Sequence, residues 1–258
     1  MKIVEIQNPP SVEELVDRFG RQDFSFVLDS AQSNDGLGKW SFFGAEPIEI
    51  VTGDLADLRQ AMRPYQIEQH PEIPFTGGAV GYLSYDYGRR LEHLPSLAED
   101  DRRIPDMHFG IYDGVAALNN KNGKLFLIGH DFNIRANAVI ERLCEIGGVR
   151  PTALTGLQKE AVTDTTSRAT MTSLSPTRCS EWEWNLSRAD FCTAVQRVRD
   201  YIASGDVYQV NLSQRARCTY DGDRIALYQA LRRGNPAPYG AYLDLGDWQL
   251  ISTSPEQF

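Results

Sequence analysis

The chain has 258 residues, of which 41% are hydrophobic, and its 35 acidic residues outnumber its 26 basic ones to give a formal net charge of −9. This length and apolar content suffice for one large domain or two small ones with a buried core. The acidic balance argues against a protein that binds nucleic acid or an anionic membrane, because few cations are available to displace phosphate counterions.

Signals for export, membrane insertion and metal binding are weak. The N-terminus lacks a basic flank followed by an apolar stretch, and no apolar run approaches the ~18 residues of a membrane span. We therefore expect a cytoplasmic protein. The four cysteines form no C-x-x-C pair and the four histidines form no H-x-x-x-H pair, so we expect no metal site within this chain.

The first elements alternate between strand and helix patterns. Residues 2–7 are typical of a strand, and Ser11 with Glu14 forms a capping box that predicts the start of a helix. Two apolar runs, 24–30 and 39–44, lie on either side of a polar, glycine-containing loop. This arrangement favours a hairpin with a long connection.

A glycine- and aromatic-rich segment follows. Gly77, Gly78 and Gly81 indicate strands whose backbones approach other atoms closely. Farther along, two apolar runs flank Asn122-Gly123, which is a strong turn signal and predicts a second hairpin. A helix that ends on glycines is expected after it.

The composition changes after residue 150. Half of the residues in 161–180 are Ser or Thr, which is typical of a flexible connector. We therefore predict an N-terminal lobe over 1–150, a connector over 151–183 and a second lobe over 184–258. The predicted fold class is α+β, with antiparallel β-sheets and helices packed on their outer faces.

The second lobe is expected to open with a helix. Ser187 is placed to cap it, and Phe191, Val195, Val198 and Ile202 fall on one helical face. This spacing predicts an amphipathic helix.

The next segment, VYQVNLSQR, alternates strictly between apolar and polar residues and predicts a strand. Its polar face carries Gln209, Asn211 and Ser213. Such a face is either the solvent side of a half-buried strand or the amide-lined wall of a pocket. The alternation itself does not choose between the two interpretations.

A glutamate stands at the end of the last predicted strand, after a Ser-Pro pair. Glu256 is either a solvated turn residue or, if burial raises its pKa, a general acid at the mouth of a sheet. Upstream, the segment 235–239 contains two prolines and forms a rigid loop. No phosphate-binding loop, dinucleotide fingerprint or nucleophile elbow is present in the sequence.

Five stretches occur in the order found in the chorismate-utilising enzymes. They are GGAVGYLSYDYGRRLEHLP, IPDMHFGIYDG, SGDVYQVNLSQR, NPAPYGAYL and STSPEQF. The chain resembles this family, and the resemblance spans nearly the whole chain outside the connector. GDVYQVNL, with Asn211, and the paired arginines of YDYGRRLE are more similar to the aminodeoxychorismate synthase branch. The anthranilate synthase branch is the alternative.

The resemblance implies a pocket for tryptophan. In the anthranilate branch the matching region resembles the feedback site for tryptophan, and in the aminodeoxychorismate branch the same pocket can hold tryptophan as a bound ligand. Carried over, its residues are Ser30, Leu37, Gly38, Lys39, Trp40, Pro238, Tyr239 and Gly240. A serine hydroxyl and backbone groups would bind the amino-acid head, while aromatic and apolar groups cover the indole.

The resemblance also gives Glu256 a role, as the proton donor that helps to expel the hydroxyl from the chorismate ring. Gln209 and Asn211 would then belong to the wall of the substrate pocket. A lysine farther along the family's sequence attacks the ring, and ammonia from a partner glutamine amidotransferase displaces it to give 4-amino-4-deoxychorismate, on the route to p-aminobenzoate and folate. Mg²⁺ held by later glutamates would neutralise the substrate carboxylate.

The lysine and the magnesium ligands are expected beyond residue 258. The resemblance therefore implies that this chain is the N-terminal part of a synthase component and that, alone, it does not turn over chorismate. Two alternatives stay open. One is anthranilate synthase, in which ammonia adds at a different ring carbon without a lysine nucleophile. The other is a non-catalytic tryptophan-binding module.

Overall fold

The computed structural model describes the chain except for residues 33–36, 68, 97–99, 151–178 and 258. The chain divides into two compact units, the first made of Met1–Ala161 with Ile225–Phe258 and the second of Val162–Arg224. Within the described residues, no helix is both long and apolar enough to cross a membrane. The mixture of antiparallel sheets and helices confirms the α+β fold class.

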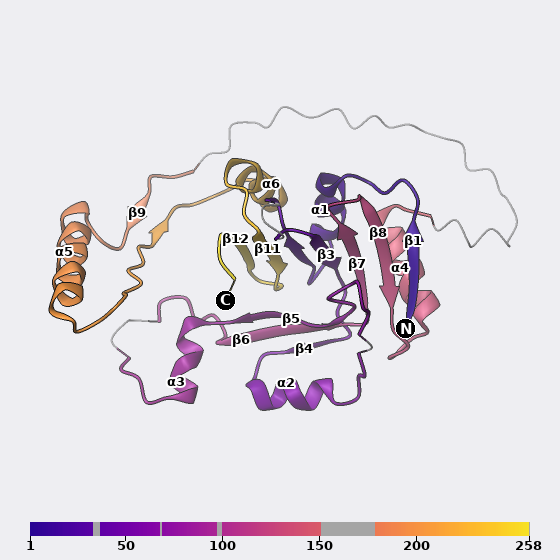
Figure 1. Ribbon diagram of the computed structural model, residues 1–258, viewed down its shortest axis with the longest axis horizontal. Coiled ribbons are helices and arrows are strands. Elements are labelled where there is room, and N and C mark those ends of the chain that lie inside the picture. Colours follow the sequence, from indigo (N-terminus) through magenta and orange to yellow (C-terminus); the bar gives the residue numbers. More distant parts are fainter. Residues whose placement is uncertain (33–36, 68, 97–99, 151–178, 258) are drawn as a thin grey trace, which may run out of the picture. The chain divides into compact units, whose positions relative to one another are not determined.

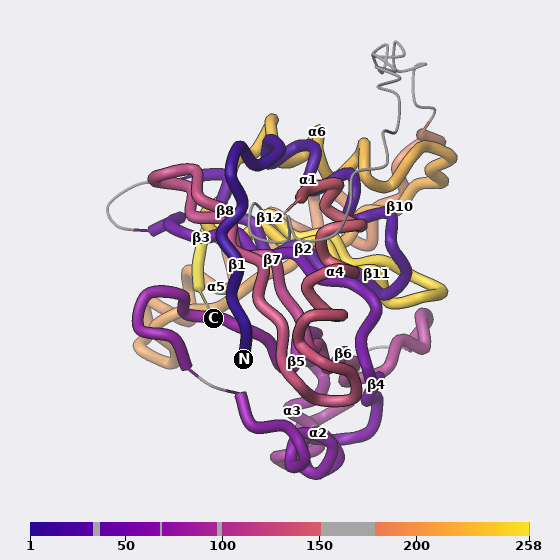
Figure 2. The backbone as a smooth tube through the Cα atoms, turned by 90° about the vertical axis from the view of Figure 1, so that its right-hand side faces the viewer, coloured from indigo at the N-terminus to yellow at the C-terminus, as the bar shows by residue number. Residues whose placement is uncertain are grey.

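A seven-stranded antiparallel sheet forms the centre of the first unit, in the order β1-β8-β7-β3-β2-β11-β12. Its strands are β1 (Lys2–Ile6), β2 (Phe26–Asp29), β3 (Trp40–Gly44), β7 (Gly114–Asn119), β8 (Lys124–Gly129), β11 (Tyr239–Asp244) and β12 (Gln249–Ser254). The N-terminal strand β1, indigo in Figure 2, is at one edge of this sheet. Both predicted hairpins are confirmed, since β2 pairs with β3 and β7 pairs with β8.

Helices α1 (Val12–Gly20) and α4 (Ala136–Gly147) cover one face of this sheet. The predicted capping box of α1 is present, with the Glu14 amide donating to Ser11 Oγ at 3.2 Å and the Ser11 amide donating to Glu14 Oε2 at 2.9 Å. The core between helices and sheet includes Phe19, Phe43 and Leu143, each fully buried. Burying such side chains is the main favourable contribution to the stability of this unit.

A three-stranded antiparallel sheet, in the order β4-β6-β5, faces the other side of the seven-stranded sheet. Its strands are β4 (Glu49–Val51), β5 (Gly78–Leu83) and β6 (Met107–Tyr112), and the two long strands lie side by side in Figure 1. Helix α2 (Leu55–Met62) packs on the outer face of this sheet. The short helices η1 (Tyr85–Tyr87) and α3 (Gly88–Leu91) follow β5.

The predicted close approach is confirmed at Gly81 and at Gly77, whereas a Cβ at Gly78 would have its nearest neighbour at 3.7 Å. Gly77 and Gly78 have φ values of +146° and +113°, which side-chain-bearing residues rarely adopt. A Cβ added to Gly81 would lie 2.6 Å from the Phe109 Cα and still nearer to the carbonyl oxygen of His108. At Gly81, therefore, the requirement for glycine is steric.

Substituting alanine at Gly81 is expected to lower the free energy of unfolding by about 3 kcal/mol, because either β5 or β6 must move to admit the methyl group. The matched control is Gly88→Ala, whose new Cβ would have its nearest neighbour at 3.7 Å and which should leave stability unchanged or raise it by about 0.5–1 kcal/mol. Urea unfolding of the two variants measures both effects. Equal stabilities would contradict the steric explanation.

The described part of the second unit contains β9 (Glu183–Trp184), helix α5 (Arg188–Ser204) and β10 (Ala216–Arg217). The strand predicted for VYQVNLSQR is wrong, since residues 207–215 form neither strand nor helix. A strand needs a neighbouring strand for its backbone hydrogen bonds. In the described part of the second unit, strand pairing is limited to β9 with β10 and an isolated bridge between Cys179 and Tyr220.

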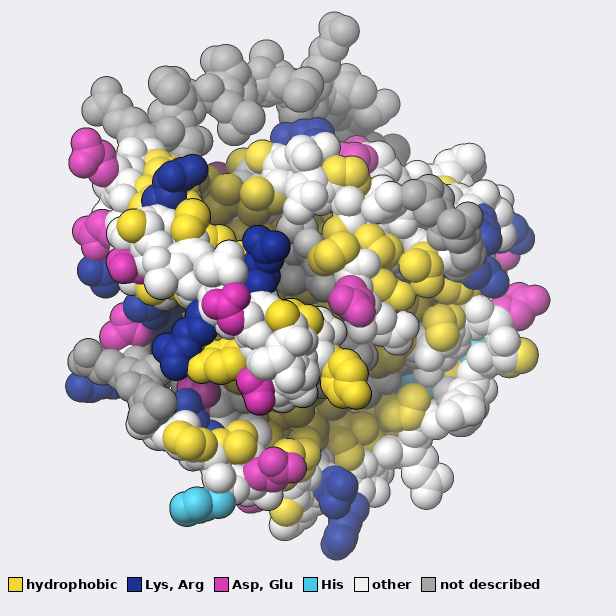
Figure 3. All heavy atoms as spheres, turned by 60° about the vertical axis from the view of Figure 1, so that its left-hand side comes forward, with side chains coloured by type: hydrophobic (Ala, Val, Ile, Leu, Met, Phe, Trp, Pro, Cys, Tyr) yellow, Lys and Arg dark blue, Asp and Glu magenta, His cyan; other side chains and the backbone are white. Residues whose placement is uncertain are grey.

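Helix α5 begins where it was predicted, with the Asp190 amide donating to Ser187 Oγ at 3.1 Å. Among the described residues nothing covers its apolar face, since α5 has no buried residue and Val195 and Ile202 are 38% and 44% exposed. Spacing alone defines an apolar stripe but does not supply the surface that covers it. Figure 3 shows hydrophobic side chains open on the face of the molecule that it draws.

The structure groups the end of the chain differently from the sequence analysis, which placed it with the second lobe. Helix α6 (Arg224–Gly234), from Ile225 onward, and strands β11 and β12 belong to the first unit, because β11 pairs with β2. Most of the predicted connector, 151–178, lies outside the described residues. The assignment of functional domains to 1–150, 151–183 and 184–258 therefore stays a prediction.

Candidate functional site

The predicted tryptophan-site residues come from three separate parts of the chain, and strand pairing brings them together. Strand β2 lies between β3 and β11, so that Gly240 is directly opposite Asp29. At the end of β2, Ser30 Oγ donates to the Pro238 carbonyl oxygen at 2.7 Å. The backbones also meet one residue farther on, where the Ala31 amide donates to the Ala237 carbonyl at 3.0 Å.

The stretch before β3 is held on the opposite side of β2. The side-chain amide of Asn120 donates to the Gly38 carbonyl at 3.1 Å, and the Asn120 backbone amide donates to the Lys39 carbonyl at 2.8 Å. The Trp40 ring is stacked on Phe42 at a centroid distance of 6.2 Å. Leu37, the first residue of this stretch, is 47% exposed.

A buried polar network lies beneath this junction. The fully buried hydroxyl of Ser41 donates to Asp29 Oδ1 at 2.9 Å and accepts from the Asn120 side-chain amide at 3.0 Å and the Ser30 backbone amide at 3.3 Å. Each of these contacts satisfies a polar group that folding removes from water. The network therefore fixes the end of β2 and the backbone at Ser30.

Asp29 is also paired with a cation from helix α6. The Arg232 guanidinium contacts the Asp29 carboxylate, and it contacts Glu13 Oε1 at 2.8 Å. Burial acts to lower the pKa of Arg232, but the hydrogen bond to Asp29 and the charges of Asp29 and Glu13 outweigh it and raise the pKa. Burial, followed by the negative charge of Asp29, raises the pKa of the nearby Tyr228 hydroxyl.

A hollow of about 420 Å³ adjoins this network. Its lining contains Ser30, Asn120 and Arg232 together with apolar groups from the loop before α1, among them Pro9 and Pro10. Hydroxyl, amide and guanidinium groups beside apolar surface suit a small zwitterion that carries a hydrophobic side chain. Of the predicted tryptophan-site residues, Ser30 lines this hollow.

Glu256 lies two residues after the end of β12, and its side chain is exposed. Its backbone is held by Ser254, whose hydroxyl donates to the Glu256 carbonyl oxygen at 2.8 Å. The Tyr239 hydroxyl donates to Gln257 Oε1 at 3.3 Å, which ties the start of β11 to the segment that carries Glu256. Tyr239 of the predicted tryptophan site and the predicted proton donor are thus placed by the same hairpin.

Gln209 and Asn211 belong to the second unit, whereas Glu256 belongs to the first. Both side chains are exposed, and Gln209 Nε2 donates to Asn211 Oδ1 at 3.3 Å. They therefore lie on the same side of their segment, even though that segment is not a strand. Their place in a common pocket with Glu256 stays a prediction.

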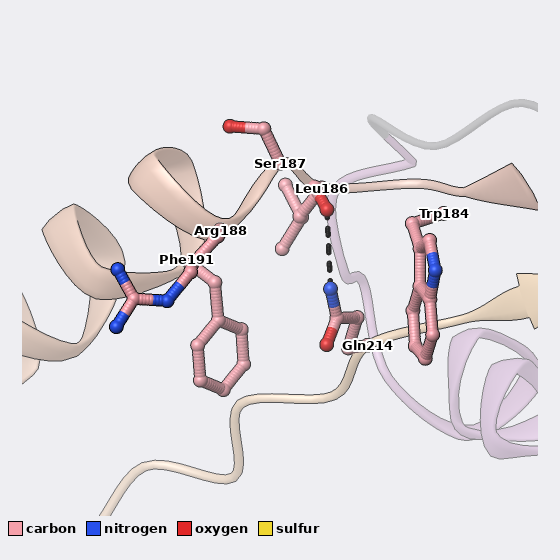
Figure 4. Close-up of a pocket in the computed structure, with 6 residues that line it drawn as sticks. All are labelled: Trp184, Leu186, Ser187, Arg188, Phe191 and Gln214. Atoms are coloured by element: carbon pink, nitrogen blue, oxygen red, sulfur yellow. Dashed lines mark hydrogen bonds between the residues drawn. The ribbon is translucent and has the colours of Figure 1, made fainter.

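The second unit contains a hollow of its own, of about 400 Å³, that no sequence pattern indicated (Figure 4). The rings of Trp184 and Phe191 lie on opposite sides of this hollow, and the Leu186 side chain lies between them. Gln214 Nε2 donates to the Leu186 carbonyl oxygen at 3.1 Å and connects the two segments. The lining is mainly apolar, with Arg188 as a cation at its margin.

Among the described residues, no three His, Cys, Asp or Glu side chains gather closely enough to hold a metal ion. Divalent magnesium is usually bound through carboxylates and substrate oxygens. We therefore derive no chemical step through a metal from this part of the chain.

Sequence reasoning missed the polar groups that support the predicted site. Asp29, Arg232 and Asn120 were not singled out from the sequence. The available signal was the position of each charge or amide at the end of a strand or helix. That signal does not say which of these ends meet.

The sequence of this chain is similar to those of known proteins. The model of a chorismate binding enzyme family matches residues 35–258. Aminodeoxychorismate synthase component 1 of Klebsiella aerogenes is 34% identical over 214 residues, covering 83% of this chain and 41% of that protein. Anthranilate synthase component 1 of Acetivibrio thermocellus is 30% identical over 267 residues, covering 94% of this chain and 53% of that protein.

The fold also has a counterpart among solved structures. Anthranilate synthase component I of Streptococcus pneumoniae TIGR4 matches with a TM-score of 0.57 and 24% identity, over 99% of this chain and 50% of that one. At this identity the likeness concerns the fold alone. The chain spans about half the length of the solved structure, and between 41% and 53% of the two curated relatives.

Proposed function

The chain belongs to the family of chorismate-binding enzymes, and on that premise we propose that it is part of the synthase component of an aminodeoxychorismate synthase. The reaction would convert chorismate and ammonia to 4-amino-4-deoxychorismate, for p-aminobenzoate and folate synthesis. The observation that carries the proposal is the 34% identity to an aminodeoxychorismate synthase component 1 over 83% of the chain. The segments GDVYQVNL and YDYGRRLE add support from their likeness to the same branch.

Glu256 is the proposed proton donor to the ring hydroxyl that leaves. Protonating a hydroxyl as it departs removes the cost of expelling hydroxide, and a positioned carboxylic acid contributes about 10²–10⁴-fold to such a step. The hairpin β11–β12 delivers this side chain to the end of the seven-stranded sheet. The carboxyl is exposed in this chain, so the burial that a general acid requires would come from the bound substrate and the rest of the enzyme.

Ammonia is proposed to come from a partner glutamine amidotransferase, because the curated relatives are named as component 1 of their synthases. The attacking lysine and the ligands of Mg²⁺ are proposed to lie outside this chain. On this proposal the 258 residues provide one wall of the active site. We therefore expect the chain alone to form no product from chorismate and ammonia.

A bound tryptophan is the second part of the proposal. The hollow beside Ser30 offers a hydroxyl and the guanidinium of Arg232 for the amino-acid head, and the apolar loop at Pro9 and Pro10 for a hydrophobic side chain. The network through Asp29 and Ser41 holds these groups in place before a ligand arrives. Such preorganisation favours binding because less order remains to be imposed.

Calorimetric titration of the chain with tryptophan is expected to show binding that a Ser30→Ala substitution weakens by about tenfold or more, as for the loss of one hydrogen bond to a charged group. Ser213→Ala is the matched control, because Ser213 is exposed and belongs to the second unit. A flat trace for the unsubstituted chain at about 1 mM tryptophan would remove the pocket from the proposal.

The reading frame beyond the Phe258 codon tests which branch the enzyme belongs to. A Pro-Ile-Lys-Gly-Thr-like stretch there is the result that the proposal predicts. An alanine in place of the lysine would favour anthranilate synthase, which the 30% identity to an anthranilate synthase component 1 keeps as the second candidate. An immediate stop codon would contradict the catalytic proposal and favour a binding module.

A further inference from the structure

Two cysteines of the second unit lie on segments that run antiparallel to each other. Cys179 forms a β-bridge with Tyr220, and the next pair is joined by hydrogen bonds, with the Ser180 amide donating to the Thr219 carbonyl at 3.1 Å and the Thr219 amide donating to Ser180 Oγ at 2.8 Å. Because Cys179 is opposite residue 220, Cys218 is its diagonal neighbour on the same side of the ladder.

The side chains of this pair are close enough to interact, because the Cys179 thiol acts to raise the pKa of the Cys218 thiol. Both cysteines are free in the structure. A disulfide requires two sulfurs that reach one another without a large backbone movement. Farther along the same two segments, Arg217 pairs with Glu183 at 2.7 Å and β9 pairs with β10, so the alignment of the thiols rests on several contacts.

The two thiols differ in how easily reagents reach them. Cys179 is exposed, whereas Cys218 is half-buried. Burial raises the pKa of Cys218, and the neighbouring Cys179 thiol raises it further. An oxidant from solution therefore meets Cys179 first, and Cys218 is the thiol placed to complete a bond with it.

We propose that Cys179 and Cys218 form a reversible intramolecular disulfide by exchange with a small-molecule disulfide such as oxidised glutathione. The Cys179 thiolate attacks one sulfur of the oxidant, which forms a mixed disulfide and releases one small thiol. The Cys218 sulfur, after losing its proton to water, attacks the Cys179 sulfur and releases the second thiol. Two protein thiols lose two electrons and two protons, and one small-molecule disulfide is reduced to two thiols.

The disulfide would close a loop that contains helix α5 and the predicted pocket-wall residues Gln209 and Asn211. A bond between the ends of such a loop restricts the unfolded chain and stabilises the folded loop against opening. The oxidation state of the surroundings would then set how firmly this part of the second unit is held. The inference does not depend on the chorismate reaction.

The test is to equilibrate the purified 258-residue chain with mixtures of reduced and oxidised glutathione, count free thiols and identify the linked peptides. Trypsin separates all four cysteines into different peptides, with CSEWEWNLSR and CTYDGDR carrying Cys179 and Cys218. The expected result is the loss of two of the four thiols and a cross-link between these two peptides, independent of protein concentration.

Cysteine variants distinguish the Cys179–Cys218 disulfide from other oxidation products of the chain. Cys179→Ser and Cys218→Ser are each expected to abolish the cross-link and to leave a glutathione adduct on the remaining thiol. Cys192→Ser, which removes another exposed thiol on α5, should leave the bridge and its redox midpoint unchanged. Retention of all four thiols, cross-links to Cys144 or Cys192, or glutathione adducts in place of the bridge in the unsubstituted chain would overturn the proposal.

Discussion

Urea unfolding of an Asp29→Ala variant is expected to give a free energy of unfolding about 3–5 kcal/mol below that of the unsubstituted chain. The Asp29 side chain is 1% exposed and that of Arg232 is 16% exposed. Removing the carboxylate leaves the guanidinium without its buried partner and removes the acceptor of the Ser41 hydroxyl. Both groups then bear the cost of burial without compensation.

Glu13→Ala is the matched control for this prediction, because Glu13 contacts the same guanidinium from a side chain that is 51% exposed. An exposed ion pair contributes about 0–1 kcal/mol, so the control should remain close to the unsubstituted chain. If the free energy of unfolding of the Asp29→Ala variant also fell by less than about 1 kcal/mol, the result would contradict the claim that the buried network holds the end of β2 in place.

Replacing Glu256 with glutamine in the complete synthase component is expected to lower kcat by about 10²–10⁴-fold, because glutamine keeps the shape of the side chain but has no proton to donate to a leaving hydroxyl. The KM for chorismate should change much less than kcat, since the amide still occupies the same place. Steady-state kinetics with chorismate and ammonium as substrates measure both values.

Asp247→Asn is the matched control for Glu256, since Asp247 is an exposed carboxylate in the turn of the same β11–β12 hairpin. The kcat of the Asp247→Asn enzyme should stay within about twofold of that of the unsubstituted enzyme, as expected for a surface substitution away from the reacting atoms. A Glu256→Gln enzyme as active as this control would show that another group supplies the proton.

Local signals were enough for the elements whose partners are near in sequence. The turn at Asn122-Gly123 predicted the β7–β8 hairpin, and the pair of Ser11 and Glu14 predicted the start of α1. In each case the residues that determine the structure are within a few positions of one another. Both patterns can therefore be interpreted without knowing the rest of the fold.

The segment from Val207 to Arg215 shows where such signals fail. Its alternation matches a strand, but a strand forms only with a partner, and the choice of partner is not written in the alternation. The apolar stripe of α5 likewise says that a face is apolar and does not say what covers it. In both segments, what the pattern leaves out is the partner.

The candidate site was predictable only in part. Asp29 and Arg232 are 203 positions apart in sequence, and only the pairing of β2 with β11 brings helix α6 close enough for them to meet. Pro238 and Glu256 were found through ordered stretches shared with a family, and Ser30 through the resemblance to a tryptophan site. Composition and spacing alone named no reaction for them.

The most direct test of the central claim is the product that the complete synthase component forms from chorismate and ammonia, identified by mass and ultraviolet absorbance. The proposal predicts 4-amino-4-deoxychorismate. Anthranilate, or chorismate recovered unchanged, would contradict it.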